Sequence, residues 1–219
     1  MELTAADIAM LLPKRDENAH KGNFGRILLL CGSLGYTGAA YFAAMGALRT
    51  GAGLVYLGVP ESIYAIEAGK LNEPVIFPLP EKDGMLSEDA LPQILERLPK
   101  MDALLIGPGL GQSPGTFRVL TALLENARCP AVVDADGINL LAGHMDVLHG
   151  RAWPTVLTPH DGEFARLFGP VGDDRMASAQ RAARESGAIV LLKGHRTCIT
   201  DGITAYRNTT GNPGMAVGG

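Results

Sequence analysis

The chain contains 219 residues, of which 47% are hydrophobic and 19% charged, and its formal net charge is −4. This composition is typical of a globular protein, and the lack of clustered Lys and Arg argues against a nucleic-acid partner. Apolar runs are all shorter than the roughly 18 residues of a membrane-spanning helix, so we expect no membrane partner.

The hydrophobic pattern predicts strands that alternate with helices. In chain order, we expect a strand at 26–31, a helix at 38–50, a strand at 54–59, a helix at 61–70, a strand at 75–77, a helix capped by Ser87 and ending at 98, a strand at 103–106, a helix at 115–127, strands at 131–133 and 155–157, a helix ending at 168, a helix at 173–186 and a strand at 189–192.

The end of the chain changes character. Residues 197–200 and 203–206, joined by Asp201-Gly202, are typical of a β-hairpin with a two-residue turn. The alternation before it indicates an α/β fold with a mostly parallel, doubly wound sheet and helices on both faces. No linker or repeat divides the chain, so we expect a single domain over residues 1–219.

The three cysteines, Cys31, Cys129 and Cys198, are odd in number and lie in or beside apolar, strand-like runs. We interpret them as buried, reduced thiols, which suit a reducing compartment. Glu2, Asp7 and Lys14 make the N-terminal segment unlike a signal peptide. These features favour a cytoplasmic protein.

Four expected strands run directly into glycine-rich or polar loops, at 32–38, 107–111, 134–139 and 158–163. In doubly wound folds, ligands bind outside the carboxyl ends of the strands. We therefore expect a ligand site at that edge, although glycine between strand and helix is also ordinary turn chemistry. The first loop matches neither a dinucleotide-binding fingerprint nor a Walker loop.

The polar residues of these loops each allow two interpretations. Asp134 and Asp136 could bind Mg²⁺ through water, or Asp136 could cap a helix. His160 could face a ligand or only terminate a helix. Lys193, beside Gly194 after a buried strand, suits a nucleotide phosphate or ribose, but a simple turn with a solvated lysine would look the same. We assign no metal-ligating residue.

Five segments occur in a characteristic order. They are GSLGYTGAA at 32–40, IGPGLG at 106–111, DADGIN at 134–139, TPHDGE at 158–163 and NTTGN at 208–212. Together they closely resemble the ADP- or ATP-dependent NAD(P)H-hydrate dehydratases, a branch of the ribokinase-like superfamily. The similarity runs from about Lys21 to the last residue.

The resemblance implies repair of hydrated NADH or NADPH. The S epimer of the hydrate carries a ring hydroxyl, which ADP or ATP would phosphorylate, with Mg²⁺ as the expected cofactor. Loss of phosphate, a far better leaving group than hydroxide, would then regenerate the reduced cofactor. Catalysis of phosphoryl transfer is mostly positioning and charge stabilisation.

The resemblance also implies roles for individual residues. The residues expected to contact or line the hydrate site are Ala39, Gly109, Asp136, Asn139 and His160. Those expected to bind the adenine nucleotide are Lys193, Gly194, His195, Arg196, Thr197, Asn208 and Gly218. Asp161 stands where proline is commoner in the family.

In this family, the glycine pair that corresponds to Gly218-Gly219 is followed by a small hydroxyl residue, a glycine and an aspartate that opens a helix. That aspartate is the expected general base. The catalytic residue is therefore unassigned here, and we expect the domain to be C-terminally incomplete, with its last helices missing and its turnover weak or absent.

About 20 residues precede Lys21, too few for the epimerase domain that is fused to some members, so a separate epimerase is the expected partner. Apolar surface near the C-terminal hairpin should be exposed or covered by another subunit, which favours a homo-oligomer. Two other functions remain open: a ribokinase-like kinase of a vitamin-precursor alcohol, and an inactive dinucleotide-binding remnant.

Overall fold

The computed structural model describes residues 1–215, and its main feature is a nine-stranded sheet in the order β11-β10-β9-β8-β7-β6-β1-β2-β3. The sheet is parallel from β3 to β9, and β10 and β11 are antiparallel. Its strands are β1 (Arg26–Leu30), β2 (Leu54–Pro60), β3 (Val75–Leu79), β6 (Ala103–Ile106), β7 (Ala131–Val133), β8 (Thr155–Leu157), β9 (Ile189–Leu192), β10 (Cys198–Thr200) and β11 (Ala205–Arg207).

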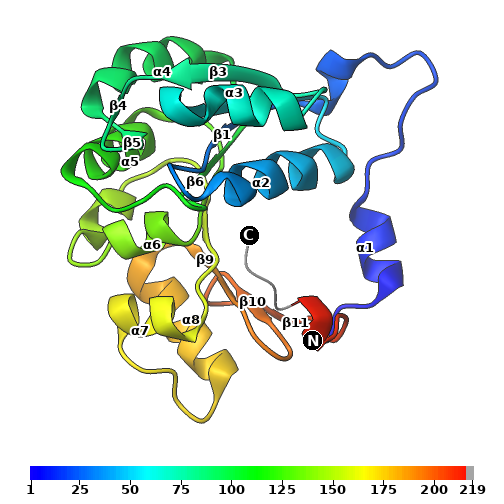
Figure 1. Cartoon of the computed structure of the whole chain (residues 1–219). Helices are drawn as coiled ribbons and strands as arrows, with labels where there is room; N and C mark the ends of the chain where they lie inside the picture. Colours follow the sequence, from blue (N-terminus) through cyan, green and yellow to red (C-terminus); the bar gives the residue numbers. More distant parts are fainter. Residues whose placement is uncertain (216–219) are drawn as a thin grey trace.

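Helices lie on both sides of this sheet (Figure 1). They are α2 (Thr37–Arg49), α3 (Glu61–Lys70), α4 (Leu91–Arg97), α5 (Pro114–Asn126), α6 (Asp136–Leu140), α7 (Asp161–Phe168) and α8 (Arg175–Ser186). Short 3₁₀ helices occur at Lys21–Phe24, Glu88–Ala90, Leu98–Lys100, Met145–Leu148 and Pro213–Met215. The expected α/β class, with a mostly parallel sheet and helices on both faces, is confirmed.

The two faces of the sheet are buried to different extents. One face is covered from β3 to β10, because α4 to α8 pack on residues such as Leu28, Leu104 and Val190, which are fully buried. The opposite face is covered over β1 to β3, where α2 and α3 bury Leu29 and Leu57.

Beyond those strands, the second face carries a row of half-buried apolar residues. Residues that pair across neighbouring strands lie on the same face of the sheet. Strand pairing connects the residues of this row in two groups. They are Leu105, Val132, Val156 and Ile189, then Leu191, Ile199 and Tyr206. We call these seven residues the apolar row.

Two expected elements differ from the structure. Ser87 makes no side-chain capping bond, and the segment after it forms a 3₁₀ turn, then α4, then a second 3₁₀ turn, because prolines occur at the start of both later elements. The turn between β10 and β11 spans residues 201–204, not two residues, since Thr200 pairs with Ala205. Asp201 Oδ1 accepts bonds from the N–H groups of Ile203 and Thr204, which stabilises this wider loop.

Two further elements were not foreseen. Strands β4 (Glu81–Lys82) and β5 (Met85–Leu86) form a hairpin whose two-residue turn is Asp83-Gly84, with φ of 53° and 75°. The N-terminal helix α1 (Ala5–Leu11) has no buried residue (Figure 1). Among residues 1–215, no helix combines the length and hydrophobicity needed to cross a bilayer.

Candidate functional site at the carboxyl edge of the sheet

Five loops gather at one edge of the parallel sheet, where β1, β6, β7, β8 and β9 end. They are the loops at 32–38, 107–111, 134–139, 158–163 and 193–197, which we call the rim. Backbone bonds tie neighbouring loops together: Gly32 N donates to Pro108 O, and Lys193 N donates to Pro159 O. The parallel register thus brings together segments that are far apart in the sequence.

The 107–111 loop touches its neighbours through glycines. Gly107 has φ of +126°, and a Cβ there would meet the carbonyl oxygen of Asp134 and the backbone of Gly137. Gly109 has φ of +62°, and a Cβ there would lie 2.7 Å from the Cβ of Ala39. Ala39 and Gly109, both expected at the hydrate site, are therefore neighbours at the rim, and only a residue without a side chain fits at position 109.

Asp136 serves the rim and does not cap a helix. It is the first residue of α6, whose N-cap residue is Ala135, and no side-chain capping bond is made. Its carboxylate accepts bonds from Gly111 N at 2.9 Å and from Gln112 Nε2 at 2.9 Å. The capping interpretation of Asp136 is therefore wrong, because its two oxygens hold the 107–111 loop.

Asn139, on the same short helix, accepts a 2.9 Å bond from Arg166 Nη1 of α7. The side-chain amide nitrogen of Asn139 donates no hydrogen bond within the described part of the chain, so it keeps donor capacity for a ligand.

His160 caps α7 through its imidazole ring. Nδ1 accepts bonds from Gly162 N at 2.9 Å and Glu163 N at 3.3 Å. In the neutral ring the proton is then on Nε2, which makes Nε2 a donor. The His160 side chain is 54% exposed, whereas that of Glu163 is 6% exposed and accepts a bond from His160 N. The helix-end interpretation is thus correct, and the ring still presents an exposed edge at the rim.

Lys193 directly follows β9, and its side chain extends past the end of β8 to Asp134 at the end of β7. Its Nζ lies 2.7 Å from Asp134 Oδ1 and 3.7 Å from Glu163 Oε2. The lysine therefore is not the solvated residue of a simple turn. It holds one positive charge against two carboxylates at the centre of the rim, where an entering phosphate could compete for it.

The turn after Lys193 is compact. Gly194 has φ of +150° and Arg196 has φ of 59°, and Thr197 Oγ1 donates to Gly194 O at 3.0 Å. Asn208, directly after β11, lies beside the end of this turn, because its N–H donates to Thr197 O. These contacts bring Lys193 to Thr197 and Asn208 together. Gly218 lies outside the described residues.

Two charged residues at the rim, Arg175 and Glu163, were given no site role in the sequence analysis. Arg175 Nη1 donates to Asp161 Oδ2 at 2.8 Å, and Nη2 donates to Lys193 O at 2.8 Å. The hydrogen bond from Arg175 lowers the pKa of the Asp161 carboxyl. Glu163 could have been found, since a Glu three residues after a capping residue is a helix-start signal. Arg175 gave no such signal, because only the folded chain brings it to the rim.

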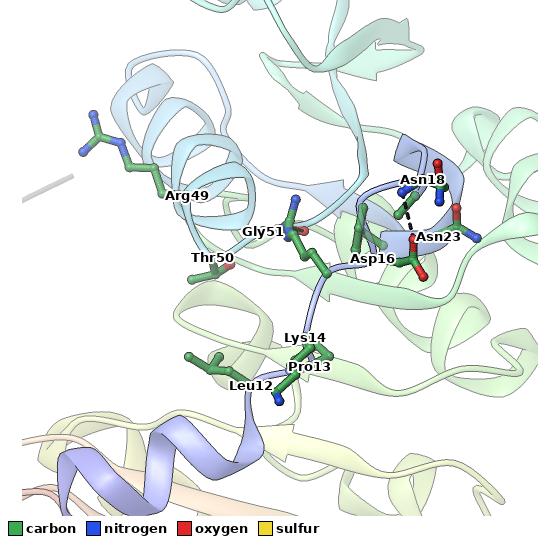
Figure 2. A pocket seen from close by; sticks show the side chains of 12 residues that line it. Leu12, Pro13, Lys14, Asp16, Asn18, Asn23, Arg49, Thr50 and Gly51 are labelled. Atoms are coloured by element: carbon green, nitrogen blue, oxygen red, sulfur yellow. Dashed lines mark hydrogen bonds between the residues drawn. The ribbon is translucent and has the colours of Figure 1, made fainter.

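A cavity lies elsewhere in the fold (Figure 2). It is formed between the N-terminal arm, including Leu12 and Lys14, and the residues before β1 and β2, including Phe24 and Gly51. That is the amino end of the sheet, away from the rim. We take the rim as the candidate site, because ligands of doubly wound folds bind at the carboxyl ends.

A model of the NAD(P)H-hydrate dehydratase family matches residues 27–219. The chain belongs to this family. The bifunctional NAD(P)H-hydrate repair enzyme Nnr of Moorella thermoacetica is 49% identical over 99% of this chain and 42% of that protein. The chain thus spans less than half the length of that relative.

Solved structures show the same fold. The ADP/ATP-dependent NAD(P)H-hydrate dehydratase from Bacillus subtilis, co-crystallised with ATP/Mg²⁺, is 31% identical, with a TM-score of 0.83 over 98% of this chain and 74% of that one. A ribokinase-like superfamily protein from Enterococcus faecalis is 27% identical, with a TM-score of 0.80 over 94% of this chain and 70% of that one.

Proposed function

We propose that this family member takes part in nucleotide-dependent dehydration of the S epimer of hydrated NADH or NADPH. The phosphoryl group of ADP or ATP is transferred to the ring hydroxyl, and loss of phosphate with a neighbouring ring proton restores the reduced nicotinamide. Because the reaction needs two ligands side by side, the protein's main task is to position them.

The observation that carries this proposal is the adjacency of two loops. The 158–163 loop holds His160, and the 193–197 turn holds Lys193, with Lys193 N bonded to Pro159 O at 2.8 Å. Lys193 Nζ offers a charge for phosphate, and the adjacent pair Ala39 and Gly109, with His160 on the loop bonded to Lys193, would offer a surface for the hydrate. Asp136 and Asn139 would line that surface, and Gly194 to Thr197 with Asn208 would hold the nucleotide.

Mg²⁺ enters this proposal with the nucleotide. Among the described residues, no three acidic, histidine or cysteine side chains gather into a metal site. Asp134 is paired with Lys193, and Asp136 already accepts two bonds. These residues do not fit a protein cage for the ion, which commonly retains water and binds phosphate oxygens.

Three further features belong to the proposal. An NAD(P)H-hydrate epimerase supplies the S epimer, and copies of the chain associate through the apolar row. The protein works in the cytoplasm, which suits three free, buried thiols. Burial raises the pKa of the Cys31 and Cys129 thiols, which keeps them in the unreactive protonated form.

The test is incubation with S-NADPH hydrate and either ADP or ATP, followed by the absorbance of the reduced ring and by release of inorganic phosphate. The proposal predicts that reduced ring and phosphate form in equal amounts, at the weak rate expected from the sequence, and that His160→Ala weakens hydrate binding. His149→Ala is the matched control, since His149 Nε2 lies 3.3 Å from Glu185 O, at the end of α8 that is farther from the rim.

Other outcomes would contradict the proposal. Phosphorylation of a thiazole or pyrimidine alcohol without hydrate turnover would indicate a kinase of a vitamin precursor. Tight binding of the hydrate without any phosphate release would indicate a dinucleotide-binding remnant.

A further inference from the structure

One arginine outside the expected site residues contacts two rim loops at once. Arg175 is the first residue of α8, and its guanidinium lies between Asp161, which follows His160, and the carbonyl oxygen of Lys193. Nη1 is 2.8 Å from each carboxylate oxygen of Asp161, and Nη2 is 2.8 Å from Lys193 O. A single side chain therefore connects the expected hydrate loop with the expected nucleotide turn.

The guanidinium also shapes the turn that it holds. A Cβ at Gly194 would lie 2.7 Å from Arg175 Nη2, so the guanidinium packs directly on the glycine backbone. The Arg175 side chain is only 29% exposed, and its two terminal nitrogens point to protein acceptors. It is therefore placed to hold the turn, not to touch a reacting group.

Lys193 is consequently fixed at three points. Its N–H donates to Pro159 O, its carbonyl accepts from Arg175, and its Nζ is paired with Asp134. The planar fork of an arginine can serve a carboxylate and a carbonyl in two set directions, which the single ammonium of a lysine cannot do. Loss of the fork would free the carbonyl end of Lys193 while leaving its Nζ contact intact.

We propose that Arg175 is a positioning residue that holds the 193–197 turn against the His160 loop and thereby sets the affinity for adenine nucleotide. This inference rests on the proposed function. The ion pair with Asp161 orients the guanidinium, and the bond to Lys193 O carries that orientation to the nucleotide turn.

The experiment compares Arg175→Lys, Asp161→Asn and Arg184→Lys with the wild type by titration calorimetry with ADP. Arg184 is the matched control, because it lies on the same helix and donates to a backbone carbonyl, that of Gly202. We expect a rise in Kd of about tenfold for Arg175→Lys, since one charged hydrogen bond to the turn is lost. Asp161→Asn, which keeps the bond to Lys193 O, should give a rise of about threefold.

Hydrogen exchange of residues 193–197 in the ligand-free protein provides a second measurement. Arg175→Lys should speed exchange there, and Arg184→Lys should not. Unchanged exchange, unchanged ADP affinity, or an equal loss of affinity in Arg184→Lys would overturn the inference. Failure of the wild type to bind ADP would instead contradict the proposed function, and the exchange comparison would still decide whether Arg175 holds the turn.

Discussion

Two glycines of the rim keep neighbouring loops closer together than any side chain would permit. Gly107 and Gly109 combine a positive φ with contacts to Asp134, Gly137 and Ala39. Neither a longer side chain nor an ordinary backbone conformation fits there. The glycines of this loop therefore have a structural role that is independent of any ligand.

We expect Gly107→Ala to lower the free energy of unfolding by about 3 kcal/mol, because backbone strain is added to a clash with Asp134 O. Gly35→Ala is the control, since Gly35 also has a positive φ but no atom lies within 4 Å of the position that its Cβ would take. It should cost about 1 kcal/mol. Urea unfolding of both variants measures the difference, and equal losses would contradict the packing argument.

Glu67 is a buried acid outside the rim. Its side chain is fully buried on α3, and Oε1 contacts Lys70 Nζ at 3.3 Å, whereas Oε2 has no partner among the described residues. Burial raises the pKa of this carboxyl, and the bond from Lys70 offsets the effect only in part. An acid with a raised folded-state pKa binds its proton more tightly when folded, so it stabilises the protein in acid and loses that contribution as pH rises.

Glu67→Gln should therefore be more stable than the wild type at neutral pH, and the gain should shrink as pH falls to about 4.5. Thermal unfolding across pH 4 to 8 tests this expectation, because a carboxyl with a raised pKa changes its charge within this range. Glu185→Gln is the control, because Glu185 is half exposed beside Arg181. A gain that is the same at every pH would show that the charge of Glu67 is not the cause.

The identity of the rim residues could be predicted from the sequence, but their partners could not. Loop position brought Gly109, His160 and Lys193 to one edge, since parallel strands end together, whereas Ala39 was expected only from the family resemblance. The contact of Asp136 with Gly111, and that of Arg175 with Lys193, depend on distances that only packing sets.

Helix α5 shows how an element supports the rim. It begins at Pro114, directly after the 107–111 loop, and Ser113 Oγ accepts from Thr116 N while Thr116 Oγ1 accepts from Ser113 N. This reciprocal capping satisfies two backbone donors at the helix start. Its other face buries Val119 and Leu120 against the sheet.

We expect Ser113→Ala to lower the free energy of unfolding by about 1 kcal/mol, the usual effect of losing a helix cap. Thr4→Ala removes the same kind of capping box from α1, which has no buried residue. Because α1 adds nothing to the core, its variant should unfold at the wild-type denaturant midpoint. A shift of equal size in both variants would argue against this account.

Asp-Gly pairs illustrate why element boundaries are harder to predict than element types. Both Asp83-Gly84 and Asp201-Gly202 suit a two-residue hairpin turn, yet only the first adopts one. Asp201 instead binds the N–H groups of two later residues, and Thr200 Oγ1 donates to Thr204 O. Side-chain bonds of this kind compete with the tight turn, and local sequence does not decide between them.

The molecule as a whole leaves one apolar surface half covered. The apolar row extends over β6 to β11 on the face opposite α5 and α8, while β6 to β10 are buried on the other face. Aliphatic residues in such a row favour burial against another surface. Our proposal of a homo-oligomer requires that a second copy of the chain covers the apolar row.

Ile199→Lys should therefore lower the molar mass measured by light scattering to that of one chain, because a charge is placed in the apolar row. Ile203→Lys is the control, since Ile203 lies four residues away in the turn and is 89% exposed. Circular dichroism should be unchanged in both variants. A wild-type protein that is already monomeric, or an equal effect of both substitutions, would contradict the proposal.

The most direct test of the whole account is the structure of the protein soaked with NADPH and ADP. We predict that both molecules bind at the rim, with the nicotinamide ring near Gly109 and His160 and the phosphates beside Lys193. Binding of either one in the cavity beside the N-terminal arm (Figure 2), at the opposite end of the sheet, would contradict it.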